Sequence, residues 1–211
     1  MSKDREILPA ENNYDKAHTY EKMMQRYKKA VKEEFFFEAV LIDYAVIEDR
    51  MLSFLYHCGI QNSRTDIKIS KIGRRGLKLI LPEGTRKNGA YSLNGLENKI
   101  KIINAILIWT SQIEFSNDII EDSRDYKYLN ALKIQCEGLD VQEFQELLEK
   151  VYAWKGYRNE IVHAVMNKNM DALMEGLKDR VEEGYELGRA LDKQVRMRRN
   201  MLLNEKFGFD K

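Results

Sequence analysis

An arginine and a histidine stand five positions apart late in this chain, at Arg158 and His163. The guanidinium group of arginine stays protonated and can donate paired hydrogen bonds to phosphate oxygens. Histidine is the side chain whose ordinary pKa lets it take and return a proton near neutral pH. This pairing is suited to cleaving a phosphodiester bond without a metal, so both residues are candidate catalytic groups.

The residues around this pair predict a helix that would carry it. Apolar side chains at Ile161, Val162, Ala164 and Val165 are spaced to pack one side of a helix. The polar amide of Asn159 follows the arginine directly, and we expect it to orient either a bound phosphate or the histidine. Glu160 either does similar work or faces solvent.

The pattern Arg158-Asn159-x3-His163 resembles the Arg-x4-6-His signature of HEPN domains, in which Asn, Asp or His often follows the arginine. The resemblance implies a metal-independent endoribonuclease that cleaves RNA by attack of the 2'-OH. It also implies a homodimer with a composite active site. Many small prokaryotic HEPN proteins are growth-arrest toxins or phage-defence effectors, so an antitoxin or regulatory partner is expected as well.

HEPN domains often add a polar or acidic side chain from an earlier helix. The candidates here are Asp43, Glu48 and Asp49, each of which interrupts or ends a strongly apolar segment. Glu48 is our choice for this role. The alternative for each carboxylate is an ion pair with a core lysine or arginine, because an unpaired buried charge is costly. Arg50 is one such partner.

Two alternatives to the enzyme remain open from the sequence. His163 could be a histidine at the core edge, satisfied by backbone or carboxylate contacts. The whole chain could then be a non-catalytic helical module that binds nucleotide, RNA or a protein partner, with Arg158 serving only as an anion anchor.

Composition favours one compact, helical domain. The chain has 211 residues, 44% of them apolar and only two of them proline, which is enough for a well-buried core. Its 35 basic and 34 acidic side chains balance to +1, so any attraction to RNA must be local. Neither the two cysteines nor the histidines show metal-site spacing, and no cofactor motif or membrane-spanning run is present. We therefore expect a cytoplasmic protein without metal, cofactor or membrane partner.

Hydrophobic periodicity predicts an all-α, up-and-down bundle of about five to six helices within residues 14–211, after a flexible segment at 1–13. Helices are expected over about 14–32, 35–58, 93–115, 126–137 and 140–154, with a capping box at Asp140 and Glu143. A last helix is expected over about 171–203. Its Gly176, Gly184 and Gly188 are interpreted as points of close packing against another helix.

Residues 61–94 predict a loop-rich, basic insertion, because four glycines and a proline interrupt any long helix. Five of its cations are candidate RNA contacts: Arg74, Arg75, Lys78, Arg86 and Lys87. A solvated surface loop explains them equally well. The basic end of the last helix, including Arg189, Lys193 and Arg196, either extends a phosphate track or complements the helix dipole.

Gly156 lies two positions before Arg158, and it predicts a bend or break in the helix there. Arg158 would then lie near a helix start, where free backbone N–H groups also favour anions. In an unbroken helix, Arg158 and His163 would instead be about 140° apart around the axis and about 7.5 Å apart along it. They would then not face one phosphate squarely, whereas a second subunit could supply the missing partner.

Overall fold

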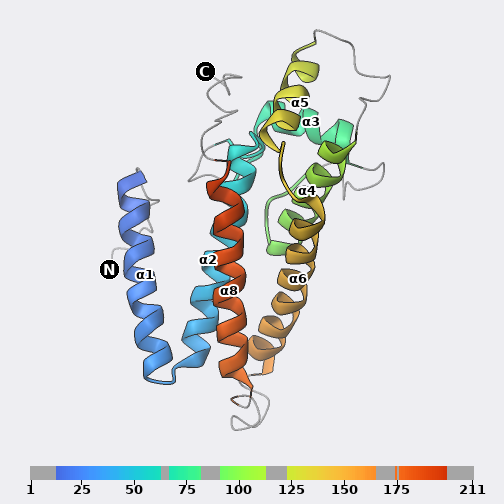
Figure 1. Cartoon of the computed structure of the whole chain (residues 1–211). Coiled ribbons are helices and arrows are strands. Elements are labelled where there is room, and N and C mark those ends of the chain that lie inside the picture. Colours follow the sequence, from blue (N-terminus) through green and yellow to red (C-terminus); the bar gives the residue numbers. More distant parts are fainter. Residues whose placement is uncertain are drawn as a thin grey trace, which may run out of the picture.

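The computed structural model describes residues 13–62, 67–81, 91–112, 123–164, 174 and 176–198, and these form seven helices (Figure 1). They are α1 (Asn13–Lys32), α2 (Phe36–His57), α3 (Lys71–Ile80), α4 (Leu96–Ser111), α5 (Arg124–Gln135), α6 (Val141–Ala164) and α8 (Leu177–Arg196). The described residues contain no strand, only one isolated bridge between Gln61 and Ile69. The all-α prediction is confirmed. Residues 1–12 lie outside the described part.

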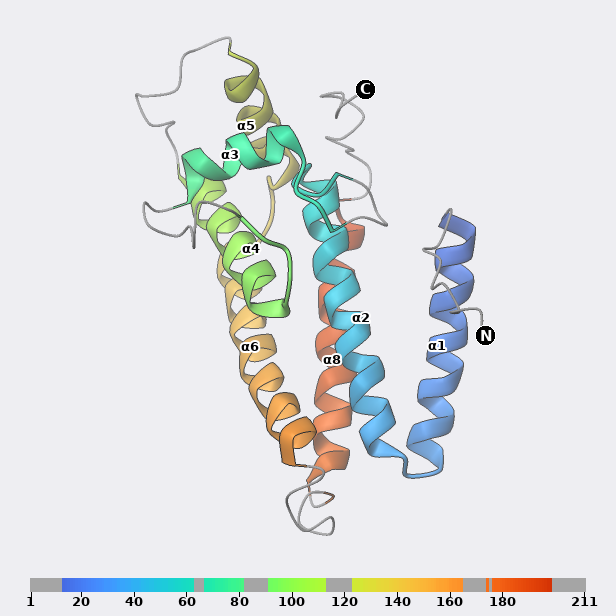
Figure 2. The same cartoon turned by 180° about the vertical axis from the view of Figure 1, so that it is seen from behind.

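Four long helices, α2, α4, α6 and α8, form the centre of the bundle (Figures 1 and 2). Their facing sides are apolar, and large side chains such as Trp154, Phe54 and Phe144 are fully buried between them. Phe54 of α2 and Phe144 of α6 meet edge to face with their ring centroids 5.2 Å apart. This core ties together helices that are distant in sequence and fixes the register of α6.

The chain direction does not alternate at every step of the bundle. On α2 and α8, contacts pair Asp43 with Gly184 and Arg50 with Asp192, so the numbers rise together and the two helices are parallel. On α4 and α6, Lys155 contacts Glu97 and Gln145 contacts Asn104. The residue numbers therefore rise along one helix as they fall along the other, and these two helices are antiparallel. α6 is therefore antiparallel to its neighbours, and its C-terminal end lies where α2 and α8 begin (Figure 2).

Two glycines allow α8 to approach its neighbours closely, as the sequence predicts. A Cβ at Gly184 would lie 2.6 Å from Trp154 Cζ2 and 3.1 Å from Asp43 Cβ, and one at Gly188 would lie 3.2 Å from Val46 Cγ1. Gly176 differs. It directly precedes α8, and its φ of +73° is a left-handed conformation outside the helical range, so α8 begins at Leu177. The prediction of one helix from about 171 is therefore wrong, and α8 ends at Arg196 rather than near 203.

The prediction of a loop-rich insertion at 61–94 is wrong for residues 71–80, which form α3. The hydroxyl of Ser70 caps this helix by accepting the Gly73 N–H at 2.8 Å. Gly73 and Gly76 do not break it, because both are needed where α3 packs closely. A Cβ on the first would lie 2.8 Å from Ile60 Cα, and one on the second 2.5 Å from Tyr128. Ile72 and Leu77 are buried, so α3 belongs to the core.

α1 stands at the edge of the bundle and packs mainly on α2 (Figure 1). Its buried contacts come from Tyr27 and Ala30 near its C-terminal end, whereas Tyr14 and Tyr20 nearer its start are exposed. Among the described residues, none of the helices has both the length and the apolar character needed to cross a membrane.

Candidate active site

α6 carries all three residues of the sequence motif and runs without a break from Val141 to Ala164. The predicted bend or break at Gly156 is therefore wrong. A glycine in a helix costs about 1 kcal/mol relative to alanine, and burial of Val151, Trp154 and Ile161 holds the helix on either side of it. Arg158 thus lies in the C-terminal part of α6, away from any free backbone N–H groups, and the predicted support from a helix start is absent.

The start of α6 shows the capping interaction that the sequence predicts. The backbone N–H of Glu143 donates to Asp140 Oδ1 at 2.9 Å. This contact satisfies one of the N–H groups that a first helical turn leaves without a partner. It fixes where α6 begins and therefore which of its side chains face α2, α4 and α8.

The guanidinium of Arg158 is held by two neighbours. Its Cζ lies 4.3 Å from the centroid of the Tyr44 ring on α2, and its Nη1 donates to Asn159 Oδ1 at 3.1 Å. The side chain is partly buried, and Nε has no hydrogen-bond partner within the described part of the chain. Asn159 therefore orients the arginine rather than the histidine in this structure.

Tyr44 joins the arginine to the preferred carboxylate, Glu48. Burial is the main cause that raises the pKa of Tyr44, the negative charge of Glu48 raises it further, and the positive charge of Arg158 lowers it. Tyr44 and Glu48 are four residues apart and share one face of α2. The structure therefore brings Tyr44, Arg158 and Asn159 together at the α2–α6 contact, with Glu48 one helical turn from Tyr44 on α2.

Glu48 also takes part in the ion pair that the sequence offers as an alternative. Lys99 Nζ, on α4, donates to Glu48 Oε1 at 2.7 Å and to the Gly95 carbonyl at 3.3 Å. The lysine is only 1% exposed, so this carboxylate compensates a buried charge. Glu48 thus has a structural partner in Lys99.

The other two acidic candidates differ sharply in their surroundings. Asp49 binds Lys16 at 2.6 Å and also binds Arg50, and these two cations lower its pKa although burial opposes them. Asp43 is buried, its Oδ2 has no hydrogen-bond partner among the described residues, and burial raises its pKa to about 8. Neither carboxylate lies in the Arg158 cluster.

His163 is exposed in the last turn of α6, and Glu160 is exposed as well. Because α6 is regular, His163 lies about 140° around the helix from Arg158 and about 7.5 Å further along it. The structure therefore does not bring the imidazole of His163 against the guanidinium of Arg158 within one chain.

The candidate RNA contacts on α3 lie at the other end of the bundle (Figure 1). Arg74 and Lys78 are exposed, and Arg75 binds Asp125 of α5 at 2.8 Å. Arg86 and Lys87 lie outside the described residues. α6 begins at the α3 end, and its rise places Arg158 about 25 Å further along. These cations do not join the Arg158 cluster.

Two residues of the cluster's surroundings are not indicated by the sequence. Tyr44 lies in an almost wholly apolar stretch, where the natural interpretation is a core aromatic. Arg180, on α8, places its Cζ 4.6 Å from the Tyr157 ring, and its carbonyl accepts Trp154 Nε1–H at 2.8 Å. The neighbouring sequence does not indicate either contact, because both depend on the register of α6 against α2 and α8.

The described residues contain no group of three or more His, Cys, Asp or Glu side chains placed to hold a metal ion. No protein-family model matches the chain, and comparisons with curated proteins and with solved structures also give no match.

Proposed function

We propose that this chain is a metal-independent endoribonuclease of HEPN type. Arg158 would bind the scissile phosphate and stabilise the charge that develops on it, and His163 would transfer protons. The observation that supports this most is that two side chains contact the guanidinium of Arg158. Tyr44 and Asn159 fix its guanidinium before any ligand arrives, and pre-organised charge is what stabilises a phosphoryl transition state without further reorganisation.

The chemistry is an internal displacement at phosphorus. The 2'-oxygen attacks, His163 accepts the proton of the 2'-OH, and the bond from phosphorus to the 5'-oxygen breaks. The leaving 5'-oxygen takes a proton from a second imidazole or from water. The products are a 2',3'-cyclic phosphate and a 5'-hydroxyl. DNA has no 2'-OH and should not be cut.

A homodimer is part of this proposal, because Arg158 and His163 on one α6 do not face a single phosphate squarely. Around a two-fold axis, His163 of one copy would meet Arg158 of the other, and each copy would complete the site of its partner. The exposed position of His163 is compatible with such a shared cleft. The biological setting suggested by the resemblance, a toxin or defence effector with an inhibitory partner, belongs to the same proposal.

The test is cleavage of an end-labelled single-stranded RNA and of DNA of the same sequence, with the ends of the products identified. We expect RNA to be cut to cyclic-phosphate ends and DNA to survive, with no requirement for magnesium. Magnesium-dependent cutting of DNA would overturn the mechanism. Arg158→Lys keeps the charge but loses the paired donors, so it should lower the rate of cleavage markedly while leaving the fold intact.

A second candidate function is supported by the same contacts. The stacking of Arg158 on Tyr44 joins α6 to α2, which is also what a structural or anion-anchoring arginine in a non-catalytic binding module would do. The two functions differ in what His163→Ala does. It should abolish RNA cleavage in the enzyme, whereas in a binding module neither the wild type nor the variant cleaves RNA.

A further inference from the structure

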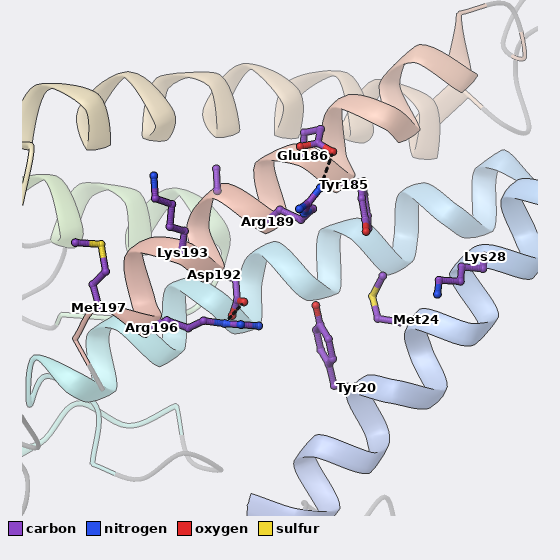
Figure 3. A pocket seen from close by; sticks show the side chains of 11 residues that line it. Tyr20, Met24, Lys28, Tyr185, Glu186, Arg189, Asp192, Lys193, Arg196 and Met197 are labelled. Atoms are coloured by element: carbon purple, nitrogen blue, oxygen red, sulfur yellow. Dashed lines mark ion pairs between the residues drawn. The ribbon is translucent and has the colours of Figure 1, made fainter. Parts of the chain in front are cut away.

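A groove of about 800 Å³ runs between α1 and α8 on the flank of the bundle (Figure 3). Tyr20, Met24 and Lys28 line it from α1, where they recur every four residues. Tyr185, Arg189, Lys193 and Arg196 are among the residues that line it from α8. In Figure 3, Tyr20 projects from α1 towards the charged side chains of α8. The groove is distinct from the Arg158 cluster.

The groove carries an excess of positive charge. Lys28, Arg189, Lys193 and Arg196 line it, against the carboxylates of Glu186 and Asp192. Those carboxylates are already compensated. Asp192 forms ion pairs with Arg50 at 2.7 Å and with Arg196 at 2.6 Å, and Glu186 lies 3.5 Å from Arg189.

Two of the cations have no such compensation. Lys28 and Lys193, on opposite walls, have no ion-pair partner in the part of the chain that the structure describes, and both are exposed. A ligand that enters between them would meet two uncompensated ammonium groups. This arrangement favours an anion over a neutral or cationic ligand.

The cations are arranged as a track rather than as a single point. Arg189, Lys193 and Arg196 succeed one another at intervals of four and three residues, so they share one face of α8 over about 10 Å. Such spacing provides contacts to more than one phosphate of an extended ligand.

Tyrosines accompany the charges on both walls. Tyr20 is 38% exposed, and Arg50 Cζ lies 5.2 Å from the centroid of its ring. Tyr185 is partly buried, because Tyr27 stacks on it with the ring centroids 5.3 Å apart and Arg189 Cζ lies 5.8 Å from its centroid. Aromatic rings beside a cationic groove are the features with which proteins bind unpaired nucleotides, since bases stack on the rings while phosphates meet the cations. Paired bases in a duplex could not use the rings in this way.

We propose that the α1–α8 groove binds single-stranded RNA. Lys28 and Lys193 contact phosphates from opposite walls, and Tyr20 provides a surface for a base. This inference builds on the proposed function, since RNA is the substrate in both. Binding in the groove nevertheless does not depend on cleavage, and the two can be tested apart.

The test measures the affinity of a fluorescein-labelled single-stranded RNA by anisotropy, with every substitution placed in a His163→Ala background so that no strand is cut. We expect Lys28→Glu combined with Lys193→Glu to weaken binding by roughly ten-fold or more, because each replaces an attraction with a repulsion. The matched control is Lys22→Glu together with Lys178→Glu. These exposed lysines lie on the same two helices but do not line the groove.

Salt dependence gives a second readout. Loss of two phosphate contacts should reduce the slope of log affinity against log salt by about 1.4, since each contact to a single strand contributes about 0.7. Tyr20→Leu should weaken binding of the single strand several-fold, while Tyr14→Leu, on the same helix, should not. Both the salt dependence and the effect of the tyrosine substitutions are measured in the His163→Ala background, so neither depends on RNA cleavage.

Equal weakening by the groove and control pairs would overturn the proposal. Equal affinity for the single strand and for its duplex would also overturn it, because the tyrosines would then have no part. If the groove pair loses binding while the wild type proves unable to cleave RNA, the groove stands and the proposed catalytic function falls.

Discussion

The guanidinium of Arg158 lies over the ring of Tyr44, with its Cζ 4.3 Å from the ring centroid. This contact joins the sequence motif on α6 to α2, the helix that also carries Glu48. Tyr44 thereby holds the cation that the proposed mechanism needs at the scissile phosphate. Removal of the ring should therefore disturb the orientation of Arg158 more than it destabilises the fold.

Tyr44→Leu should lower the rate of RNA cleavage by about ten-fold or more, because a loosely held guanidinium must be ordered during the reaction. Tyr44→Phe keeps the aromatic face and should retain most of the activity. The stability cost of Tyr44→Leu includes a cation–π contribution of about 0.5–2 kcal/mol, so thermal melts must accompany the rates. Equal activity of the Leu and Phe variants would show that the contact has no catalytic role.

Two glycines should respond in opposite directions to replacement by alanine. Gly184→Ala places a methyl group 2.6 Å from Trp154 Cζ2 and should destabilise the protein by about 1–3 kcal/mol. Gly156→Ala meets no atom within 4 Å in the middle of α6 and should stabilise it by up to about 1 kcal/mol. Urea denaturation of the two variants measures both effects. Destabilisation by Gly156→Ala would contradict the continuous helix.

Asp43 should make stability depend on pH. Burial raises its pKa from 3.8 to about 8, so the folded protein keeps this proton over a pH range in which the unfolded chain has lost it. The folded state binds more protons there, and the free energy of unfolding therefore falls as pH rises from about 4 to about 8. The fall should be of the order of a few kcal/mol.

Asp43→Asn removes this titration. Denaturation at a series of pH values should show a flatter profile for the variant and a higher stability than the wild type at pH about 8, where the charged form costs most. At pH about 4 the two proteins should be close in stability. A wild-type profile that does not fall over this range, or that the variant leaves unchanged, would show that Asp43 is not the group responsible.

The shared site makes a prediction about mixed dimers. Arg158→Ala and His163→Ala should each be inactive alone, but a dimer containing one of each retains one intact pairing of Arg158 with His163 of the other copy. If subunits exchange at random, mixing equal amounts should restore about a quarter of the wild-type rate. No recovery after subunit exchange, shown by mass spectrometry of differently tagged chains, would exclude a site composed in this way.

Local sequence patterns were sufficient for the main features of the fold. The apolar periodicity predicts the long helices, the Asp140 cap is confirmed, and Gly184 and Gly188 mark close helix packing. The same local patterns give a wrong prediction where tertiary packing determines whether a helix forms. By sequence alone Gly73 and Gly76 indicate an interrupted helix, yet they permit α3 to pack against Ile60 and Tyr128.

The site residues on α6 could be predicted from the sequence, but their partners on other helices could not. Arg158, Asn159 and His163 could be selected by chemistry and resemblance, because they are adjacent in sequence. The partnership of Tyr44 with Arg158, and of Lys99 with Glu48, depends on the register of α2 against α6 and α4, which no local pattern encodes. Gly156 misled the prediction because the cost of one glycine is small beside the burial of its helix.

The most direct test of the central claim is the rate of cleavage of end-labelled single-stranded RNA in EDTA by the wild type, Arg158→Ala and His163→Ala, with each variant confirmed folded by circular dichroism. We expect metal-independent cleavage by the wild type and its loss in both variants. Cleavage that persists in folded His163→Ala at the wild-type rate, or a wild-type homodimer with no cleavage of any RNA tested, would contradict it.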